Sequence, residues 1–237
     1  MGRAGRQIKV FADGAALEQM VAAHRSGRVD GFTTNPTLMR KAGVADYKTF
    51  AQAVLAEIRD VPVCFEVLAD DLTEMAWQAR TIACWGQNVY VKVPVTTTAG
   101  EPAAGIIREL AREGVPLNVT AVLTLEQVRT VVDALDEPTP AIVSVFAGRV
   151  ADTGRDPVPH MRAALDIVRR RPRAELLWAS PREILNLYQA EAMGCHIITL
   201  TQDLLAKAAL GGRPLEAVSL DTVRMFRDDA AAAGYTL

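Results

Sequence analysis

The sequence predicts an α/β protein with the (β/α)8 TIM-barrel fold, and three observations support this. Short apolar runs recur at intervals of about 25 residues, and a stretch with helical periodicity follows each run, which is typical of βα units and a parallel sheet. Eight such runs are present, as a closed barrel requires. The length of 237 residues is close to the roughly 250 residues of a single barrel of this kind.

The eight apolar runs are predicted as strands at residues 8–12, 31–34, 63–67, 89–93, 117–121, 142–145, 176–179 and 197–199. The helices that follow them are predicted at residues 15–26, 46–59, 71–85, 101–113, 125–135, 158–170, 182–193 and 202–209. Thr124 precedes Gln127 by three positions, which is the pattern of a capping box. Ser180 and Pro181 are predicted as an N-cap and a first-turn proline.

A ninth helix, predicted at residues 215–232, follows the eighth βα unit and has no further strand to reach. We expect it to pack outside the barrel or on a neighbouring subunit. The only linker-like stretch, residues 210–214, interrupts helical sequence and does not separate domains. Residues 1–237 are therefore predicted to form a single barrel domain, with residues 211–237 as a C-terminal helical extension.

Composition favours a cytoplasmic protein with small-molecule partners. Half of the residues are hydrophobic, yet no apolar run approaches the ~20 residues that cross a bilayer, and the N-terminus lacks the features of a signal peptide. Cys64, Cys84 and Cys195 are scattered, as expected for reduced thiols. A net charge of -2 does not indicate the basic surface that nucleic-acid binding requires. We expect no nucleic-acid or membrane partner.

Lys92 lies in the middle of the apolar run 88–95. Strand alternation puts Tyr90 and Lys92 on one face, and Pro94 ends the strand because it has no N–H to donate. Only five of the 26 basic residues are lysine. Unlike arginine, a buried lysine can lose its proton and form a Schiff base with a carbonyl substrate. Taken alone, this strand fits equally well a lysine that extends from a strand end to solvent.

Polar residues on the same inward face of the other strands favour a functional role. In a barrel, inward side chains at the carboxyl ends of the strands build the active site. Asp13–Gly14 or Asn35–Pro36 alone would more often be a cap or a turn. Seven of the eight strands, however, end in a polar residue predicted to face inward, and packing does not explain that convergence: they are Asp13, Thr33 with Asn35, Glu66, Lys92, Asn118 with Thr120, Ser144, and Ser180.

Two segments beyond the strand ends could bind a phosphate. Phe146 and Arg149 follow the sixth strand, and Ser180 and Arg182 lead into the seventh predicted helix. A helix N-terminus, a serine and guanidinium groups together suit an anion. The alternative is that both arginines are solvated loop charges. His24, His160 and His196 show no metal-ligand spacing, so we expect no metal and no cofactor.

Four ordered motifs resemble the signatures of the transaldolase family, in particular its short members that are similar to fructose 6-phosphate aldolases. The motifs are GFTTNPT at 31–37, VKVP at 91–94, NVT at 118–120 and SVFAGR at 144–149. The resemblance runs in register from Asp13 to Thr199. It implies a (β/α)8 barrel and a metal-free, class I Schiff-base mechanism that moves a dihydroxyacetone unit from a ketose phosphate to an aldose phosphate. It also implies sugar phosphates as partners and a homo-oligomer.

The resemblance also implies roles for individual residues. Lys92 matches the Schiff-base lysine, Asp13 the aspartate that handles the proton of the cleaved hydroxyl, Glu66 a carboxylate that works through a water, and Thr120 the threonine that holds this water. Contacts to the three-carbon fragment are implied for Thr33, Asn35, Asn118 and Ser144. The substrate phosphate is implied to lie at Arg149, Ser180 and Arg182, with Phe146 also in the substrate site.

Alternatives within and outside this family remain. Fructose 6-phosphate aldolases, which release dihydroxyacetone, tend to carry glutamine and tyrosine where this chain has Glu66 and Phe146. The chain departs from the usual family pattern at Gly14, Val145 and Pro181, which allows a variant that serves a specialised sugar pathway. A phosphosugar-binding barrel or isomerase that uses Lys92 only as a charge is a further alternative, permitted by the fold.

Overall fold

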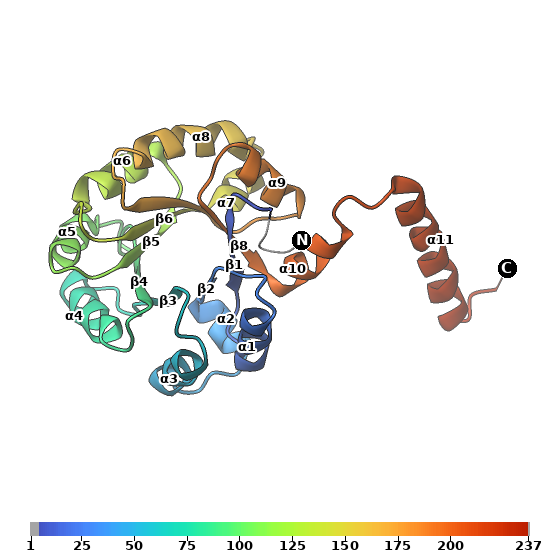
Figure 1. Cartoon of the computed structure of the whole chain (residues 1–237), viewed down its shortest axis with the longest axis horizontal. Helices are drawn as coiled ribbons and strands as arrows, with labels where there is room; N and C mark the ends of the chain where they lie inside the picture. The colour runs from blue at the N-terminus through green and yellow to red at the C-terminus, as the bar shows by residue number, and fades with distance from the viewer. Residues whose placement is uncertain (1–4, 237) are drawn as a thin grey trace.

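A computed structural model describes residues 5–236 and contains a closed barrel of eight parallel strands in sequential order (Figure 1). Strand β8 pairs with β1 in the parallel direction, which closes the sheet. The (β/α)8 barrel predicted from the sequence is therefore confirmed. The strands are β1 (Lys9–Asp13), β2 (Gly31–Thr33), β3 (Val63–Glu66), β4 (Val89–Pro94), β5 (Leu117–Val122), β6 (Ala141–Val145), β7 (Ala174–Trp178) and β8 (Ile197–Thr201).

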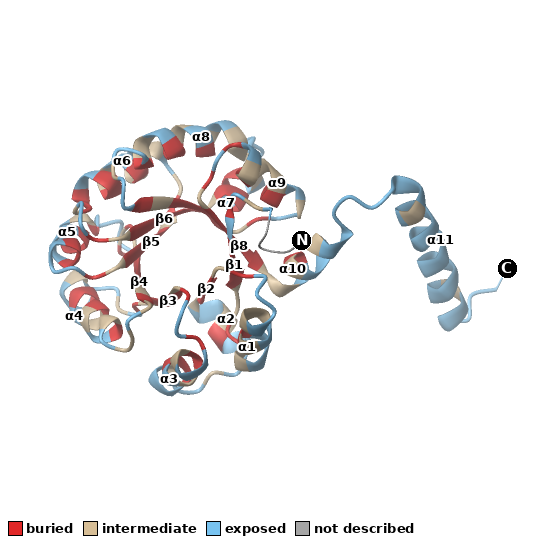
Figure 2. Ribbon diagram, in the orientation of Figure 1, coloured by how far each residue is buried: buried red, intermediate tan, exposed pale blue. Residues whose placement is uncertain are grey.

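Helices follow the strands, and every α-helix except the last buries part of its surface against the barrel (Figure 2). They are α1 (Leu17–Arg25), α2 (Pro36–Lys41), α3 (Tyr47–Glu57), α4 (Leu72–Ala83), α5 (Ala104–Arg112), α6 (Leu125–Ala134), α7 (Ala147–Asp152), α8 (Pro157–Val168), α9 (Leu185–Ala192), α10 (Gln202–Lys207) with a 3-10 turn at Ala208–Leu210, and α11 (Leu215–Ala232). The short helices α2 and α7 were not predicted from the sequence. Each begins within three residues of a strand end, and Asn35 caps α2 by accepting from Leu38 N–H at 2.9 Å.

The capping predictions had opposite outcomes. Thr124 and Gln127 form a capping box at the start of α6, as predicted. Ser180 does not cap the seventh helix, because α9 begins at Leu185 and Ile184 is its N-cap, without a side-chain hydrogen bond. Ser180 instead adopts a left-handed backbone conformation with φ of 59°. The prediction of a helix that starts at Arg182 was therefore wrong.

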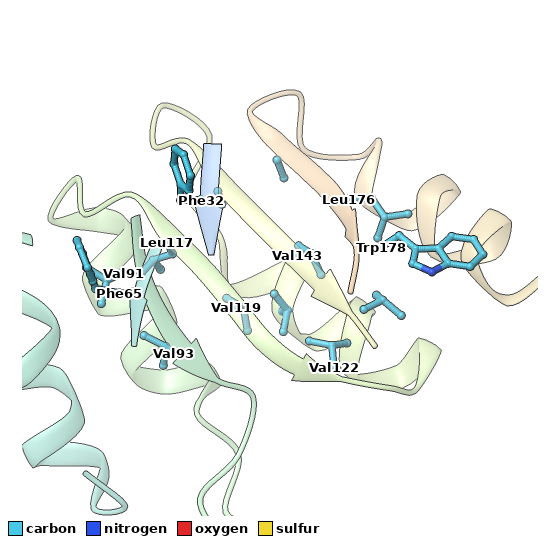
Figure 3. Packing of buried hydrophobic residues seen from close by; sticks show 14 of the residues in the cluster. Phe32, Phe65, Val91, Val93, Leu117, Val119, Val122, Val143, Leu176 and Trp178 are labelled. Atoms are coloured by element: carbon cyan, nitrogen blue, oxygen red, sulfur yellow. The ribbon is translucent and has the colours of Figure 1, made fainter. Parts of the chain in front are cut away.

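Alternation along the strands divides the apolar side chains between two regions. The inward residues Phe11, Cys64, Ile142, Leu177, Ala179 and Ile197 fill the barrel, with Tyr90 packed against them. Outward residues such as Val91, Val119 and Val143 belong to a larger cluster together with helix residues (Figure 3). Figure 3 also shows Trp178 projecting from its strand toward a helix. Since Lys92 shares the parity of Tyr90, its side chain is directed into the barrel.

Helix α11 differs from every other helix in its exposure. It stands away from the barrel (Figure 1), and none of its residues is buried (Figure 2). Leu215, Val218, Met225 and Phe226 recur at helical spacing and are all exposed. The predicted ninth helix is thus confirmed at residues 215–232. Among the described residues, no helix is both long enough and apolar enough to span a membrane.

Candidate active site

A cavity of about 610 Å³ opens at the carboxyl ends of the strands. All of the site residues predicted from the sequence line it except Asn118, and they are Asp13, Thr33, Asn35, Glu66, Lys92, Thr120, Ser144, Phe146, Arg149, Ser180 and Arg182. These residues come from seven different strands or the loops that follow them. Only the closed, parallel arrangement of the strands brings them together, since they span most of the sequence.

Lys92 is the central group of the cavity. Its side chain is 7% exposed, and Nζ lies 3.0 Å from Glu66 Oε2 and donates to the main-chain carbonyl of Thr34 at 2.8 Å. Glu66 and Lys92 are register partners on β3 and β4, so adjacent strands place the carboxylate beside the amine. A lysine amine in its neutral form is a nucleophile, and a carboxylate at hydrogen-bond distance is placed to accept and return protons during a reaction.

Asp13 forms a second polar centre on the β1 side. Thr33 Oγ1 donates to Asp13 Oδ1 at 2.8 Å and lies 2.6 Å from Thr199 Oγ1. Burial raises the pKa of Asp13, and the positive charge of Lys92 and the Thr33 hydrogen bond offset this only in part. A carboxyl group whose pKa is raised toward the working pH is suited to transfer protons.

Asn118 is the register partner of Lys92 on β5 and is fully buried. Its Oδ1 accepts from Ser144 Oγ at 2.7 Å, whereas its Nδ2 is buried without a hydrogen-bond partner. Buried donors are rarely left unpaired in proteins, so this amide is a candidate to meet a substrate oxygen. Just beyond, the β5–β6 register shifts between Val119 and Val122, and Ala121 adopts φ of 60°. This bulge carries Thr120 at the cavity wall.

Helix α7, which follows β6, and the loop after β7 approach one another at Gly148. A Cβ atom at Gly148 would lie 1.5 Å from the Ser180 carbonyl oxygen, so no other residue fits there without moving the chain. The Gly148 N–H donates to the Ala179 carbonyl at 3.3 Å. Arg149 follows directly, with its guanidinium carbon 5.8 Å from the centroid of the Phe146 ring.

Arg182 is exposed and already has a partner. Its Nε donates to Asp152 Oδ1 at 2.9 Å, and its Nη2 pairs with Asp152 Oδ2. The hydrogen bonds from Arg182 lower the pKa of the Asp152 carboxyl. The main-chain N–H groups of Arg182 and Glu183 both donate to Asn186 Oδ1, so they are not the free helix N-terminus that the sequence predicted. An anion bound here would therefore contact side chains and not free main-chain N–H groups.

Four further groups of the site were missed by the sequence reasoning. Thr199 and Thr201 lie on β8 and line the cavity, so the eighth strand also ends in inward polar residues. The alternation from Ile197 could have indicated both. Lys41 reaches the cavity from the unpredicted helix α2. The Thr34 carbonyl, which accepts from Lys92, carries no signal in the sequence because it is a main-chain atom.

Comparison with known families identifies the family of this chain. A family model described as Transaldolase/Fructose-6-phosphate aldolase matches residues 10–236. The chain belongs to this family. A probable transaldolase of Dehalococcoides mccartyi is 35% identical over 199 residues, which cover 84% of this chain and 88% of the relative. A probable transaldolase of Streptococcus equi subsp. zooepidemicus is 34% identical over 203 residues, which cover 84% and 89%.

Solved structures show the same fold at much lower identity. A 3-keto-L-gulonate-6-phosphate decarboxylase from Vibrio cholerae matches with a TM-score of 0.56 and 15% identity, covering 83% of this chain and 88% of that chain. A second structure, KGPDC from Streptococcus mutans, matches with a TM-score of 0.55 and 11% identity, covering 84% of this chain and 88% of that chain. These likenesses concern the barrel alone. The enzyme class follows from the transaldolase family.

Proposed function

We propose that this member of the transaldolase family transfers a dihydroxyacetone unit from a ketose phosphate, such as fructose 6-phosphate or sedoheptulose 7-phosphate, to an aldose phosphate through a Schiff base on Lys92. The observation that carries the proposal is the buried Lys92 amine, in contact with Glu66 and in the same cavity as Asp13. A carbonyl substrate that enters this cavity meets a nucleophile and two carboxyl groups that can move protons.

The first half of the reaction forms a covalent intermediate. Glu66 takes a proton from Lys92, whose Nζ lies 3.0 Å from Oε2. The neutral amine attacks the ketose carbonyl carbon, and the resulting carbinolamine loses its oxygen as water when a proton is returned to it. The product is an iminium that links Lys92 to the sugar. In this proposal Thr120, which lines the cavity, holds a water for these transfers.

The second half breaks the carbon–carbon bond. Asp13 takes the proton of the hydroxyl on the carbon of that bond that is farther from the iminium, this carbon becomes the aldehyde of the departing aldose phosphate, and the electrons of the broken bond pass into the iminium to give an enamine on Lys92. The enamine carbon then attacks the acceptor aldehyde, Asp13 returns its proton to the new alkoxide, and water releases the product. Thr33, Asn35, Asn118 and Ser144 are proposed to contact the hydroxyls of the three-carbon fragment.

The phosphate is proposed to lie between the β6 and β7 loops. Arg149, Ser180 and Arg182 line this side of the cavity, with Phe146 beside Arg149. Guanidinium groups bind phosphate through paired, charge-assisted hydrogen bonds. Arg182 would exchange Asp152 for the phosphate, because both offer anionic oxygens in the same geometry.

The deciding experiment is intact-mass measurement after borohydride reduction with fructose 6-phosphate, with and without an aldose phosphate acceptor. We expect a three-carbon adduct at Lys92 that persists without acceptor and is discharged when acceptor is added. Lys92→Ala is the matched control, and it should carry no adduct and show no turnover. Turnover by Lys92→Ala would contradict the Schiff-base assignment.

The same experiment tests the alternative of an aldolase. If the adduct is lost without an acceptor and free dihydroxyacetone appears in solution, this chain releases the three-carbon unit. Glu66 and Phe146 stand where such aldolases tend to have glutamine and tyrosine, which supports transfer. Tight binding of a ketose phosphate without any adduct would indicate a binding barrel or isomerase.

We also propose that the protein is a homo-oligomer in which α11 contacts a neighbouring copy. An exposed apolar face on a helix with no buried residue supports this. Light scattering should give a multiple of the chain mass. Introducing charge with Val218→Glu and Phe226→Glu should lower that mass, whereas Arg224→Glu on the opposite helix face should not. A monomeric wild type would contradict the proposal.

A further inference from the structure

A tyrosine outside the cavity bonds to the main chain of Glu66. Tyr47 Oη accepts from Glu66 N–H at 2.7 Å and donates to the Glu66 carbonyl at 3.0 Å. Tyr47 lies on α3, which begins at this residue because Asp46 caps the helix by accepting from Thr49 N–H at 2.6 Å. Its hydroxyl therefore reaches the strand from outside the barrel, and it does not line the cavity.

In a regular parallel sheet, the backbone of β2 would bond to the N–H and carbonyl groups of Glu66 that Tyr47 occupies here. β2 donates to β3 every second residue, from Phe32 N–H to the Pro62 carbonyl at 2.8 Å and from Thr34 N–H to the Cys64 carbonyl at 3.2 Å. The next donor in this repeat is residue 36, which would bond to the Glu66 carbonyl. Residue 36 is proline and has no N–H, so the ladder stops there.

The acceptor side of the ladder is interrupted as well. By the same repeat, the Thr34 carbonyl would accept from Glu66 N–H. It accepts instead from Lys92 Nζ, at 2.8 Å. The two main-chain groups of Glu66 that face β2 are thus left without a strand partner, and the hydroxyl of Tyr47 satisfies both.

We propose that Tyr47 is a positioning residue: its hydroxyl replaces the missing β2 backbone beside Glu66, which fixes the Glu66 carboxylate and leaves the Thr34 carbonyl to Lys92. The two oxygen partners of Lys92 Nζ, the Glu66 carboxylate and the Thr34 carbonyl, then both depend on the Tyr47 hydroxyl. The ring of Tyr47 is held independently of this hydroxyl, edge-on to Phe65 at 6.1 Å and to Trp85 at 5.3 Å between ring centroids. This inference rests on the proposed Schiff-base function.

Tyr47→Phe tests the inference, because it deletes the hydroxyl and keeps the ring contacts. We expect the rate of Lys92 adduct formation with fructose 6-phosphate, and kcat, to fall about 10- to 100-fold, as is typical when a reacting group is misplaced by about 1 Å. The final extent of trapping and the KM should stay within about twofold of the wild type, since the phosphate side is untouched. Amide exchange at Glu66 should become faster.

The matched control is Thr139→Val, which also deletes a buried hydroxyl that donates to a main-chain carbonyl, that of Ala111 at 2.7 Å. Thr139 precedes β6 at the end of the barrel opposite the cavity. This variant should form the adduct at the wild-type rate. Adduct formation by Tyr47→Phe at the wild-type rate, or an equal loss in both variants, would overturn the inference. A wild type that forms no adduct would overturn the proposed function itself.

Discussion

On the β1–β4 side of the cavity the polar side chains are buried or half-buried and bonded to one another, whereas on the β6–β7 side both arginines are exposed. Lys92 and Thr33 each have two or more partners within 3.0 Å. The Arg182 guanidinium, by contrast, bonds to a surface carboxylate, that of Asp152. Buried groups with fixed partners are preorganised for chemistry, and exposed cations can adapt to a ligand. In the proposed mechanism, bonds are made and broken on the β1–β4 side and the phosphate is bound on the β6–β7 side.

The largest expected effect is at Lys92. Lys92→Arg keeps a positive charge opposite Glu66, but a guanidinium does not form a Schiff base. We expect turnover to fall by more than about 10⁴-fold, the order seen when a catalytic nucleophile is removed, while the melting temperature changes little. Steady-state assays and calorimetry measure the two. If Lys92→Arg retains a tenth of the activity, Lys92 acts only as a charge.

The next effect is at Asp13, where activity and stability should move in opposite directions. Asp13→Asn still accepts from Thr33 but cannot take up a proton. We expect kcat to fall about 10²- to 10⁴-fold, the usual contribution of a general acid or base. Because burial raises the pKa of Asp13, the folded protein holds this carboxylate at a free-energy cost at neutral pH, so the variant should melt at a higher temperature.

The pH dependence of this stabilisation follows from the sign of the shift. Below the ordinary aspartate pKa both folded and unfolded wild type are protonated at Asp13, and the cost is absent. As the pH rises through the raised pKa of the folded state, the wild type loses stability that Asp13→Asn does not lose. The difference in melting temperature should therefore be larger at about pH 7 than at about pH 4. An equal difference at both values would show that the Asp13 pKa is not raised.

Smaller effects, confined to binding, are expected on the β6–β7 side. Arg149→Ala should raise the KM for a phosphorylated substrate about 10- to 100-fold, since a hydrogen bond to a charged group contributes about 1.5–3 kcal/mol. The kcat should change by less than about threefold, because Arg149 does not contact Lys92, Glu66 or Asp13. An equal loss in kcat would place Arg149 in the chemical step and remove the distinction between the two sides.

The smallest effect is expected at Arg182. It gives up Asp152 when it takes a phosphate, so Arg182→Ala should raise KM less than Arg149→Ala does. Asp152→Asn should lower KM, because it releases the guanidinium from a competing carboxylate. Substrate titration of the three variants measures the order. A higher KM for Asp152→Asn would show that the carboxylate orients Arg182 for binding.

How far the sequence could predict the site depended on strand alternation. Alternation predicted that Lys92, Asp13 and Glu66 face the inside of the barrel, and all three line the cavity. The prediction succeeded because the two-residue period is a local property of each strand and can be followed in the sequence. Alternation does not extend to Ser180, because β7 ends at Trp178 and the chain then turns through a left-handed conformation that nothing in Ser-Pro-Arg indicates. Ser180 lines the cavity as predicted, but it does not cap the next helix. Tyr47 could not be found either, since its bond to Glu66 depends on how α3 packs.

The contact between Gly148 and the Ser180 carbonyl limits how substrate preference can be redesigned. Any side chain at position 148 of α7 would strike the main chain of the β7 loop at 1.5 Å, so neither segment can be exchanged without the other. Libraries that vary residues 146–149 alone would be dominated by misfolded members wherever position 148 changes. Grafting both segments together from one relative would keep their fit, and is the practical way to vary the proposed preference for sugar phosphates.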